Sequence, residues 1–399
     1  MDFALLIQEL FSGLFYMMSG DGFKTLIMFI IAGILIALAI VKDYEPTLLL
    51  PIGFGCILAN LPPVDGFPSV LGEAGFLSVL FNAGIANELF PVLIFIAVGA
   101  MIDFSPLLKD PSTIFFGAAA QFGIFMTFIA ALLLLPLIPG LVAEGDTDMV
   151  MKLASAIGII GAADGPTTLY VANHFGLKDY MGPISVAAYS YMALVPIIQP
   201  PIIKAITTKK ERMIRMEYTP GNVTKTTRII FPVVVTIIAA AVAPMSAELI
   251  GFLMFGNLIR ECGVLNSLSE TAQKVLANLV TLFLGITIAS KMRAAAFLQW
   301  ETLLIIGLGL FAFVFDTFAG VMIAKFMNMF TKKKINPMIG AAGISAFPMS
   351  ARVVHKMGLD EDNQNFLLMH SIGVNVSGQV ASVIAGGLIL ALVKAKLGM

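Results

Sequence analysis

Eight long apolar segments constrain this chain more than any other feature of its sequence. A transmembrane helix needs about 20 mainly apolar residues. Charged residues make up only 12% of the 399 residues, whereas a soluble domain carries roughly 25%. The sequence therefore predicts an all-α polytopic membrane protein. The predicted spans lie near residues 25–41, 88–102, 113–138, 180–203, 229–247, 275–290, 302–326 and 366–391.

The charges of the loops predict an orientation. Residues 204–228 contain seven Lys or Arg and two Glu, and such a basic loop is expected in the cytoplasm. The loop at 139–149 has no Lys or Arg, so we expect it outside. If 153–175 crossed the membrane and 180–203 crossed back, the basic loop would lie outside. We therefore predict that 153–175 is a re-entrant hairpin.

The sequence also repeats itself weakly. Aligning Pro166 with Pro348 sets GAADGPTTLYVANHFGL against GISAFPMSARVVHKMGL. Upstream, Gly99 pairs with Gly285, and GFGCILANL resembles GFLMFGNLI. The repeat predicts a second hairpin at about 338–357. The alternative explanation is chance resemblance among glycine-rich membrane helices.

Opposite loop charges suggest that the two repeats are inverted in the membrane. Three acids, Glu144, Asp146 and Asp148, occupy the loop that matches the three lysines at 332–334. Lys291 would then lie outside, against the charge rule. Inverted repeats with paired broken helices are typical of transporters, whose sites lie where the breaks meet.

This reading predicts five successive regions. They are an N-terminal amphipathic segment (1–23), repeat one (24–203), the basic cytoplasmic loop (204–228), repeat two (229–391) and a C-terminal tail (392–399).

Asp164 is the strongest candidate for chemistry. A carboxylate at the bilayer centre costs about 3 kcal/mol or more, so it is expected to face a partner, a cavity or an ion. Gly165 and Pro166 break the helix and free backbone carbonyls, while Thr167 and Thr168 add hydroxyls. Such oxygens suit a hard cation. Alternatively, Asp164 only caps the following half-helix.

The last span offers further oxygen ligands in SIGVNVSGQVASVIAGG. Asn375, Gly378 and Ser382 recur at three- and four-residue spacings, so they share one helix face. We include them with Asp164 and Thr167 in the predicted cation site. Packing by small residues with interhelical hydrogen bonds is the alternative, and we favour it for Ser377 and Gln379.

Other polar residues also lie in apolar surroundings. Tyr189 and Tyr191 lie in the span at 180–203, where tyrosine is more often an interfacial anchor. Asp316 and Arg352 receive no assigned role, although the Arg352 stem could extend to the interface.

Several functional classes find no support in the sequence. It contains no P-loop, GxSxG, HExxH or dinucleotide-binding fingerprint. Its two cysteines and three histidines show no spacing for a transition-metal site. A net charge of −1 gives no reason to expect a nucleic-acid partner.

Five motifs together resemble one family. The motifs are GIIGAADGPTTLYVA, AAYSYMALVPIIQPPI, GNLIRECGV, FPMSARVVHKMG and GVNVSGQVASV. They look like the beta subunit of the biotin-dependent sodium-pumping decarboxylases, which act on oxaloacetate, methylmalonyl-CoA, glutaconyl-CoA or malonate.

The resemblance implies an elevator-like core and scaffold in a bacterial or archaeal cytoplasmic membrane. It implies partners: a carboxyltransferase alpha subunit, a biotin carrier subunit, a small membrane anchor subunit and further copies of this chain. Carboxybiotin on the carrier would be decarboxylated here, with proton uptake and sodium export.

The resemblance also implies roles for individual residues. Asp164 falls on the family's sodium-site and coupling residue, and Asn375 and Ser382 fall on its last-span ligands. A tyrosine is implicated as well, and we take Tyr191. The VNVSGQVAS motif departs from the family pattern at Ser377 and Gln379. The remaining alternative is a stand-alone sodium- or proton-coupled secondary transporter of the elevator type.

Overall fold

Regular secondary structure is entirely helical in the part of the chain that the computed structural model describes, which is residues 10–18, 20–62, 75–138, 141–143, 145–177, 180–217 and 223–399. Seven of these helical segments are long and apolar enough to cross a membrane, and one bent pair of helices is an eighth candidate. The predicted all-α, multi-pass membrane protein is thereby confirmed. The seven segments are Gly22–Lys42, Thr113–Leu137, Met181–Ile206, Lys225–Val242, Asn266–Ala289, Trp300–Phe330 and Leu368–Leu397.

The bent pair corresponds to the span predicted at 88–102. It joins Phe76–Ile85 to Leu89–Met101 at an angle of 62°. The spans coincide with the predicted ones because hydropathy alone selects segments of membrane length. One apolar helix, Pro46–Ala59, was not predicted as a span because its 14 residues are too few to cross.

The chain divides into two compact units, which do not coincide with the two predicted repeats. The first unit comprises Met1–Phe90 and Asn278–Ile305. Its described helices are α2 (Ser12–Met18), α3 (Gly20–Lys42), α4 (Pro46–Ala59), α5 (Phe76–Leu80), the π-helix η1 (Phe81–Ile85), most of α17 (Ala277–Ala289) and α18 (Ala294–Phe297).

Helices α4 and α17 cross at glycines within the first unit. A Cβ on Gly55 would lie 2.6 Å from the Cβ of Ala289, and one on Gly285 would lie 2.8 Å from Pro51. Beyond the crossing, Asn60 donates to the carbonyl of Met292 at 2.7 Å and accepts from the amide of Ala294 at 2.7 Å. Glycine therefore allows the two backbones to approach, and Asn60 fixes the end of α17 to the end of α4.

The second unit comprises Pro91–Ala277 and Ile306–Met399. Its first elements are α6 (Leu89–Met101), α7 (Ser105–Lys109), α8 (Thr113–Ala120), α9 (Phe122–Leu134), η2 (Leu135–Leu137), α10 (Thr147–Ile160), α11 (Gly165–His174) and α12 (Met181–Ile206). The remainder are α13 (Lys209–Arg212), α14 (Lys225–Val242), η3 (Pro244–Ser246), α15 (Ala247–Glu261), α16 (Asn266–Glu270), η4 (Thr271–Leu276), α19 (Trp300–Phe330), η5 (Pro337–Gly343), α20 (Met349–Glu361) and α21 (Leu368–Leu397).

Helices α6 and α15 cross in the second unit as α4 and α17 do in the first. A Cβ on Gly99 would lie 1.9 Å from the carbonyl oxygen of Leu253, and one on Gly256 would lie 2.0 Å from that of Ile96. Asn257 donates to the carbonyl of Ile102 at 2.9 Å. Each crossing therefore joins helices that are far apart in sequence through glycines and one buried asparagine.

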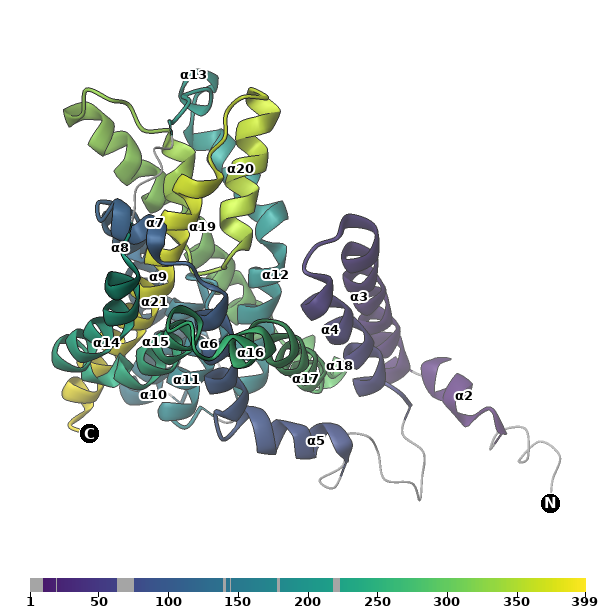
Figure 1. Cartoon of the computed structure of the whole chain (residues 1–399). Helices are drawn as coiled ribbons and strands as arrows, with labels where there is room; N and C mark the ends of the chain where they lie inside the picture. The colour runs from purple at the N-terminus through teal and green to yellow at the C-terminus, as the bar shows by residue number, and fades with distance from the viewer. Residues whose placement is uncertain are drawn as a thin grey trace, which may run out of the picture. The chain divides into compact units, whose positions relative to one another are not determined.

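The same order of elements occurs twice along the chain. In each half a long helix and an apolar helix precede a short helix that continues into a π-helix, namely η1 or η4. An apolar helix, a short helix, a membrane span, a broken pair of helices and a last span then follow. In Figure 1, α20 and α21, the last members of the second series, run beside each other.

The region boundaries differ from the prediction at three places. Residues 1–9 and 19 of the segment at 1–23 lie outside the described residues, and α3 already begins at Gly20. The loop at 204–228 is partly helical, because α12 continues to Ile206, α13 follows and α14 begins at Lys225; residues 218–222 lie outside the described ones. Helix α21 continues to Leu397 and includes most of the predicted tail.

Candidate cation site at two broken helices

The first broken helix leaves four irregular residues between α10 and α11. After Ile160, the amides of Gly161, Ala162 and Ala163 each bond to the carbonyl three residues earlier. Ala163 has φ 54°, a left-handed conformation that is unfavourable for a residue with a Cβ. Such backbone strain persists only where the surroundings impose it. The predicted break therefore exists, and its re-entrant course stays a prediction.

Asp164 closes this break and begins the next helix. Its Oδ1 accepts the amide of Thr167 at 3.1 Å, which is the geometry of a helix N-cap. Its Oδ2 accepts the hydroxyl of Ser382, on α21, at 2.7 Å. Asp164 is only 3% exposed, and no salt bridge found in the described ranges includes it. A buried carboxylate thus caps one helix while it contacts another through a hydroxyl.

Two further oxygens lie near Asp164 without a hydrogen bond of good geometry. They are the buried hydroxyls of Thr167, which is close to the Asp164 carboxylate, and of Tyr189. Tyr189 lies close enough to Asp164 for the two groups to interact electrostatically, and its ring packs on Gly165, where a Cβ would come within 2.6 Å. A buried hydroxyl without a partner lowers the stability of the fold, unless a bound ion or ligand supplies the missing contact.

The second broken helix contacts the first directly. The 3₁₀-helix η5 ends at Gly343, and α20 begins at Met349. Between them, Ser345 donates both its amide (2.9 Å) and its hydroxyl (3.0 Å) to the carbonyl of Ala162 in the first break. The two breaks are therefore joined by hydrogen bonds, with residues of both buried.

Neutral amide side chains hold the second break. Gln199, on α12, donates to the carbonyl of Ala341 at 2.6 Å and contacts the hydroxyl of Ser350 at 3.0 Å. Asn375, on α21, donates to the carbonyl of Ile344 at 2.7 Å. Gln121, between α8 and α9, donates to the carbonyl of Gly343 at 3.3 Å. These contacts satisfy carbonyls that the irregular backbone leaves free.

The predicted cation ligands form two groups. Asp164, Thr167 and Ser382 lie together at the first break. Asn375 and Gly378 lie at the second, where a Cβ on Gly378 would be 2.0 Å from the carbonyl oxygen of Gly343. Asn375 precedes Ser382 by seven residues, or about 10 Å along a helix. The five-residue cation site stays a prediction, and in this structure Asn375 and Ser382 contact different breaks.

The structure places Tyr191 away from Asp164. Its hydroxyl donates to the carbonyl of Ile306 on α19, and its ring packs near Gly309. Tyr189, two residues earlier, lies at the site instead. A helix turns about 100° per residue, so only one of the two tyrosines can face the break. The catalytic role of Tyr191 stays a prediction.

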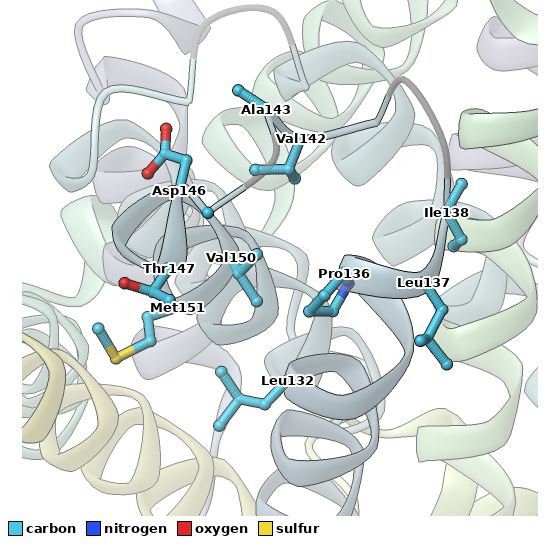
Figure 2. A pocket seen from close by; sticks show the side chains of 11 residues that line it. Leu132, Pro136, Leu137, Ile138, Val142, Ala143, Asp146, Thr147, Val150 and Met151 are labelled. Carbon is cyan, nitrogen blue, oxygen red and sulfur yellow. The ribbon is translucent and has the colours of Figure 1, made fainter.

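A separate cavity of about 600 Å³ lies between the end of α9 and the start of α10. Figure 2 shows its mostly apolar lining, which includes Leu132, Pro136 and Leu137. Asp146 lines one side and caps α10 by accepting the amide of Met149 at 2.9 Å. The 14 residues of α10 separate this cavity from the first break by about 20 Å. It is therefore distinct from the candidate cation site.

Ion pairs attach the polar end of α20 to the segment that follows α12. Arg212 contacts Glu361 at 2.6 Å, and Arg215 contacts Asp362 at 2.6 Å. The hydrogen bond from Arg215 lowers the pKa of the half-buried Asp362 carboxyl below its usual value. Arg352, whose role was unassigned, lies exposed on α20.

Comparison with known proteins identifies relatives over nearly the whole chain. The family model described as "Na+-transporting oxaloacetate decarboxylase beta subunit" matches residues 24–393. The chain is 43% identical to the oxaloacetate decarboxylase beta chain of Klebsiella pneumoniae, with 96% of this chain and 98% of that one covered. It is 46% identical to the methylmalonyl-CoA decarboxylase subunit beta of Propionigenium modestum, with 94% and 96% covered.

A third relative is the methylmalonyl-CoA decarboxylase subunit beta of Veillonella parvula, which is 45% identical with 98% of each chain covered. The resemblance read from the five motifs is thereby confirmed, and the decarboxylase subunit is favoured over the stand-alone secondary transporter. The chain belongs to the family of beta subunits of the Na+-transporting decarboxylases, and it is a multi-pass membrane subunit of such an enzyme.

Proposed function

We propose that this chain decarboxylates carboxybiotin presented by a biotin carrier subunit and couples that reaction to sodium export. Family membership supports the reaction, and the buried oxygens at the first break support a cation site. The relatives are named for oxaloacetate and for methylmalonyl-CoA. Because the carboxylic acid meets a separate carboxyltransferase alpha subunit in this scheme, the same membrane chemistry serves either acid.

The hydrogen bond between Asp164 and Ser382 is the observation that carries the proposal. It brings a buried carboxylate from the first break to an uncharged oxygen of the last span at 2.7 Å. Carboxylate and hydroxyl oxygens are ligands for a hard cation, and Thr167 and Tyr189 add unpaired hydroxyls nearby. We assign sodium to this group, with Asn375 and Gly378 as residues of the adjoining second break.

Proton uptake would couple the reaction to sodium release. When carboxybiotin loses carbon dioxide, its nitrogen–carbon bond breaks and the ring nitrogen takes up one proton. A proton on Asp164 removes the negative charge that attracts sodium, and the loss of affinity is large where the effective dielectric constant is low. Sodium then leaves to the outside, and loss of the proton restores the site.

The arrangement of elements supports the transporter architecture that we propose. The repeated element order and the paired breaks are expected of two inverted repeats. An elevator-like movement of a core against a scaffold would carry the site across the cytoplasmic membrane. Exposed basic residues fit a carboxylated or acidic carrier by charge complementarity. They include Lys209, Lys210 and the lysines at 332–334.

The remaining partners in this proposal follow the family organisation. They are the carboxyltransferase alpha subunit, the biotin carrier subunit, a small membrane anchor subunit and further copies of this chain. Tyr191 is kept as a candidate catalytic residue, but its contact with Ile306 favours a positioning role, and Tyr189 is better placed to touch the cation.

Decarboxylation of free carboxybiotin by the purified chain tests the proposal. We expect turnover that rises with sodium concentration in the wild type and falls by about 100-fold or more in Asp164→Asn. The amide is nearly isosteric and keeps an acceptor for Ser382, so the folded chain should persist; its melting temperature is the control. Sodium-stimulated turnover that survives the substitution would refute the assignment of Asp164.

A further inference from the structure

Helix α19 presents one stripe of residues to both broken helices. Gly309, Ala312, Asp316 and Gly320 recur at three- and four-residue spacings, so they share a helix face. Near the first break, a Cβ on Gly161 would lie 2.3 Å from the Cβ of Ala312. At η5, which leads into the second break, a Cβ on Gly320 would lie 2.1 Å from the carbonyl oxygen of Gly340. Asp316 therefore lies between the two contacts.

The carboxylate of Asp316 is buried without a partner. Its exposed fraction is 0%, and neither of its oxygens has a hydrogen-bond partner in the described part of the protein. It lies against the start of α9, where a Cβ on Gly123 would come within 2.5 Å of Oδ1. The amides of Gly123 and Ile124 face it without reaching hydrogen-bond geometry.

No described cationic group is near enough to neutralise this carboxylate. Helix α9 and the part of α10 at 153–160 contain no titratable side chain. Lys325, on α19 itself, is nine residues away and is engaged with the carbonyl of Ile206 and with Glu211. Tyr191, beside Gly309, donates to the carbonyl of Ile306. Asp164, three residues beyond Gly161, is engaged by Thr167 and Ser382.

These surroundings distinguish a proton from sodium. An unpaired charge in such a site costs several kcal/mol, so a cation must neutralise it for much of the time. The backbone N–H groups of Gly123 and Ile124 face Asp316, and such donors cannot serve as sodium ligands, because sodium binds to oxygens. Burial stabilises the protonated form, and these donors stabilise the ionised form. A change in the packing around the carboxylate would therefore favour binding or release of a proton.

We propose that Asp316 is a second cation site, specific for the proton, which binds and releases one proton in each transport cycle. Its place on the stripe links that exchange to both breaks, because movement of either break past α19 alters the packing around the carboxylate. The inference rests on the proposed decarboxylation-driven pump. It assigns the exchange of a proton to a residue that lies outside the sodium-binding group.

The test uses the complete decarboxylase complex reconstituted in vesicles. The variants are Asp316→Asn, which removes the titratable group, and Asp316→Glu, which keeps it. Thr317→Val is the matched control, since it changes the next buried residue, whose hydroxyl is also unpaired, off the stripe. Each is assayed for decarboxylation against pH at saturating sodium, and for the sodium concentration that gives half of the maximal thermal stabilisation.

We expect Asp316→Asn to lower turnover by about 100-fold while sodium affinity changes by less than about twofold. Asp316→Glu should retain turnover with a pH profile displaced by about half a unit or more, and Thr317→Val should match the wild type. Wild-type turnover and pH profile in Asp316→Asn would overturn the proposal, because they would mark a permanently neutral structural group. A tenfold or larger loss of sodium affinity would equally overturn it, as the residue would then be a sodium ligand.

If Asp316→Asn does not assemble, Asp316→Glu decides the question. An unshifted pH profile in that variant refutes a titrating role, and a displaced one supports it. The wild type and Asp164→Asn are assayed in parallel. Absence of sodium-stimulated decarboxylation in the wild type would refute the pump itself, which is a result that the Asp316 variants cannot produce.

Discussion

The two broken helices share one architecture but differ in charge. The first places a carboxylate, Asp164, at the start of its second half-helix, whereas Ala346 stands at the matching position of the second. The last helix of the opposite half contacts each break: Ser382 of α21 bonds to the first, and Gln199 of α12 bonds to the second. The two breaks therefore have matching neighbours, and only the first has a carboxylate at the aligned position.

The hydrogen bonds of the two breaks differ in the same sense. At the first break, Thr167 and Tyr189 keep unpaired hydroxyls beside the acid. At the second break, amide side chains donate hydrogen bonds to the carbonyls of Ala341, Gly343 and Ile344. The side-chain oxygens of Gln121 and Asn375 at the second break also lack partners. The two breaks therefore differ mainly in the carboxylate, which only the first one has. The outer ends of the two broken pairs also differ. Tyr180 bonds to the carbonyl of Leu141 at 2.5 Å at the outer end of the first pair, whereas ion pairs hold the outer end of α20.

The largest effect is expected from a methyl group at the second break. Gly378→Ala would place Cβ 2.0 Å from the carbonyl oxygen of Gly343. Backbone atoms must then move, at a cost of about 1–3 kcal/mol. Gly386→Ala is the matching substitution beside the first break. Its Cβ would lie 2.7 Å from the methyl carbon of Thr167, and the higher helix propensity of alanine offsets the cost of that contact. Thermal unfolding of the purified chain should show a clearly lower melting temperature for Gly378→Ala only; equal losses would contradict the contrast.

Two serine substitutions separate ion binding from packing. Ser382→Ala removes the hydroxyl that contacts Asp164, and we expect sodium half-saturation to rise by about tenfold, which corresponds to a lost bond to a charged group. Ser350→Ala removes a contact with Gln199 and a bond to the carbonyl of Ala341. It should lower stability by about 1 kcal/mol and leave sodium half-saturation unchanged. Sodium titrations and melting curves of both variants provide the measurement, and a sodium effect in Ser350→Ala would remove the distinction.

The smallest effect concerns the outer end of α20. Because Arg215 holds the pKa of Asp362 below its usual value, this pair stabilises the folded chain above the unfolded-state pKa, about 3.9. That contribution is lost as pH falls through the lower, folded-state pKa. Arg215→Ala should therefore reduce the melting temperature slightly at neutral pH and not at strongly acidic pH. Tyr180→Phe, at the outer end of the first broken pair, should lower the melting temperature by an amount that does not vary across this pH range. The same pH dependence in both variants would contradict the comparison.

Sequence reasoning located the parts of this fold that hydropathy and electrostatic cost determine. The spans follow from apolar length, and Asp164 follows from the cost of a carboxylate among apolar residues. Helix α4 was not predicted as a span because it is shorter than the membrane. To choose between Tyr189 and Tyr191, one must know which face of α12 points toward the break. The apolar residues of α12 do not reveal that face, because several faces of the helix are buried.

The grouping of the ligands also required coordinates. Their spacing predicted that Asn375 and Ser382 lie on the same face of the last helix. The structure shows that they are separated along that face and contact different breaks. Gln121 carried no signal in sequence, since one amide in an apolar span has no periodic partner. Its role follows only from the position of Gly343, which is 222 residues away in the chain.

The glycine crossings join helices that are synthesised at different times. Asn60 is made 232 residues before the Met292 carbonyl to which it binds. At roughly 5–20 residues per second, α4 waits on the order of ten seconds or more before α17 exists. During that interval the glycine face of α4 must be covered by lipid or by an insertion factor. Helices α3 and α4, which pack against each other, therefore enter the membrane first, and α4 meets α17 only when about three quarters of the chain has been made.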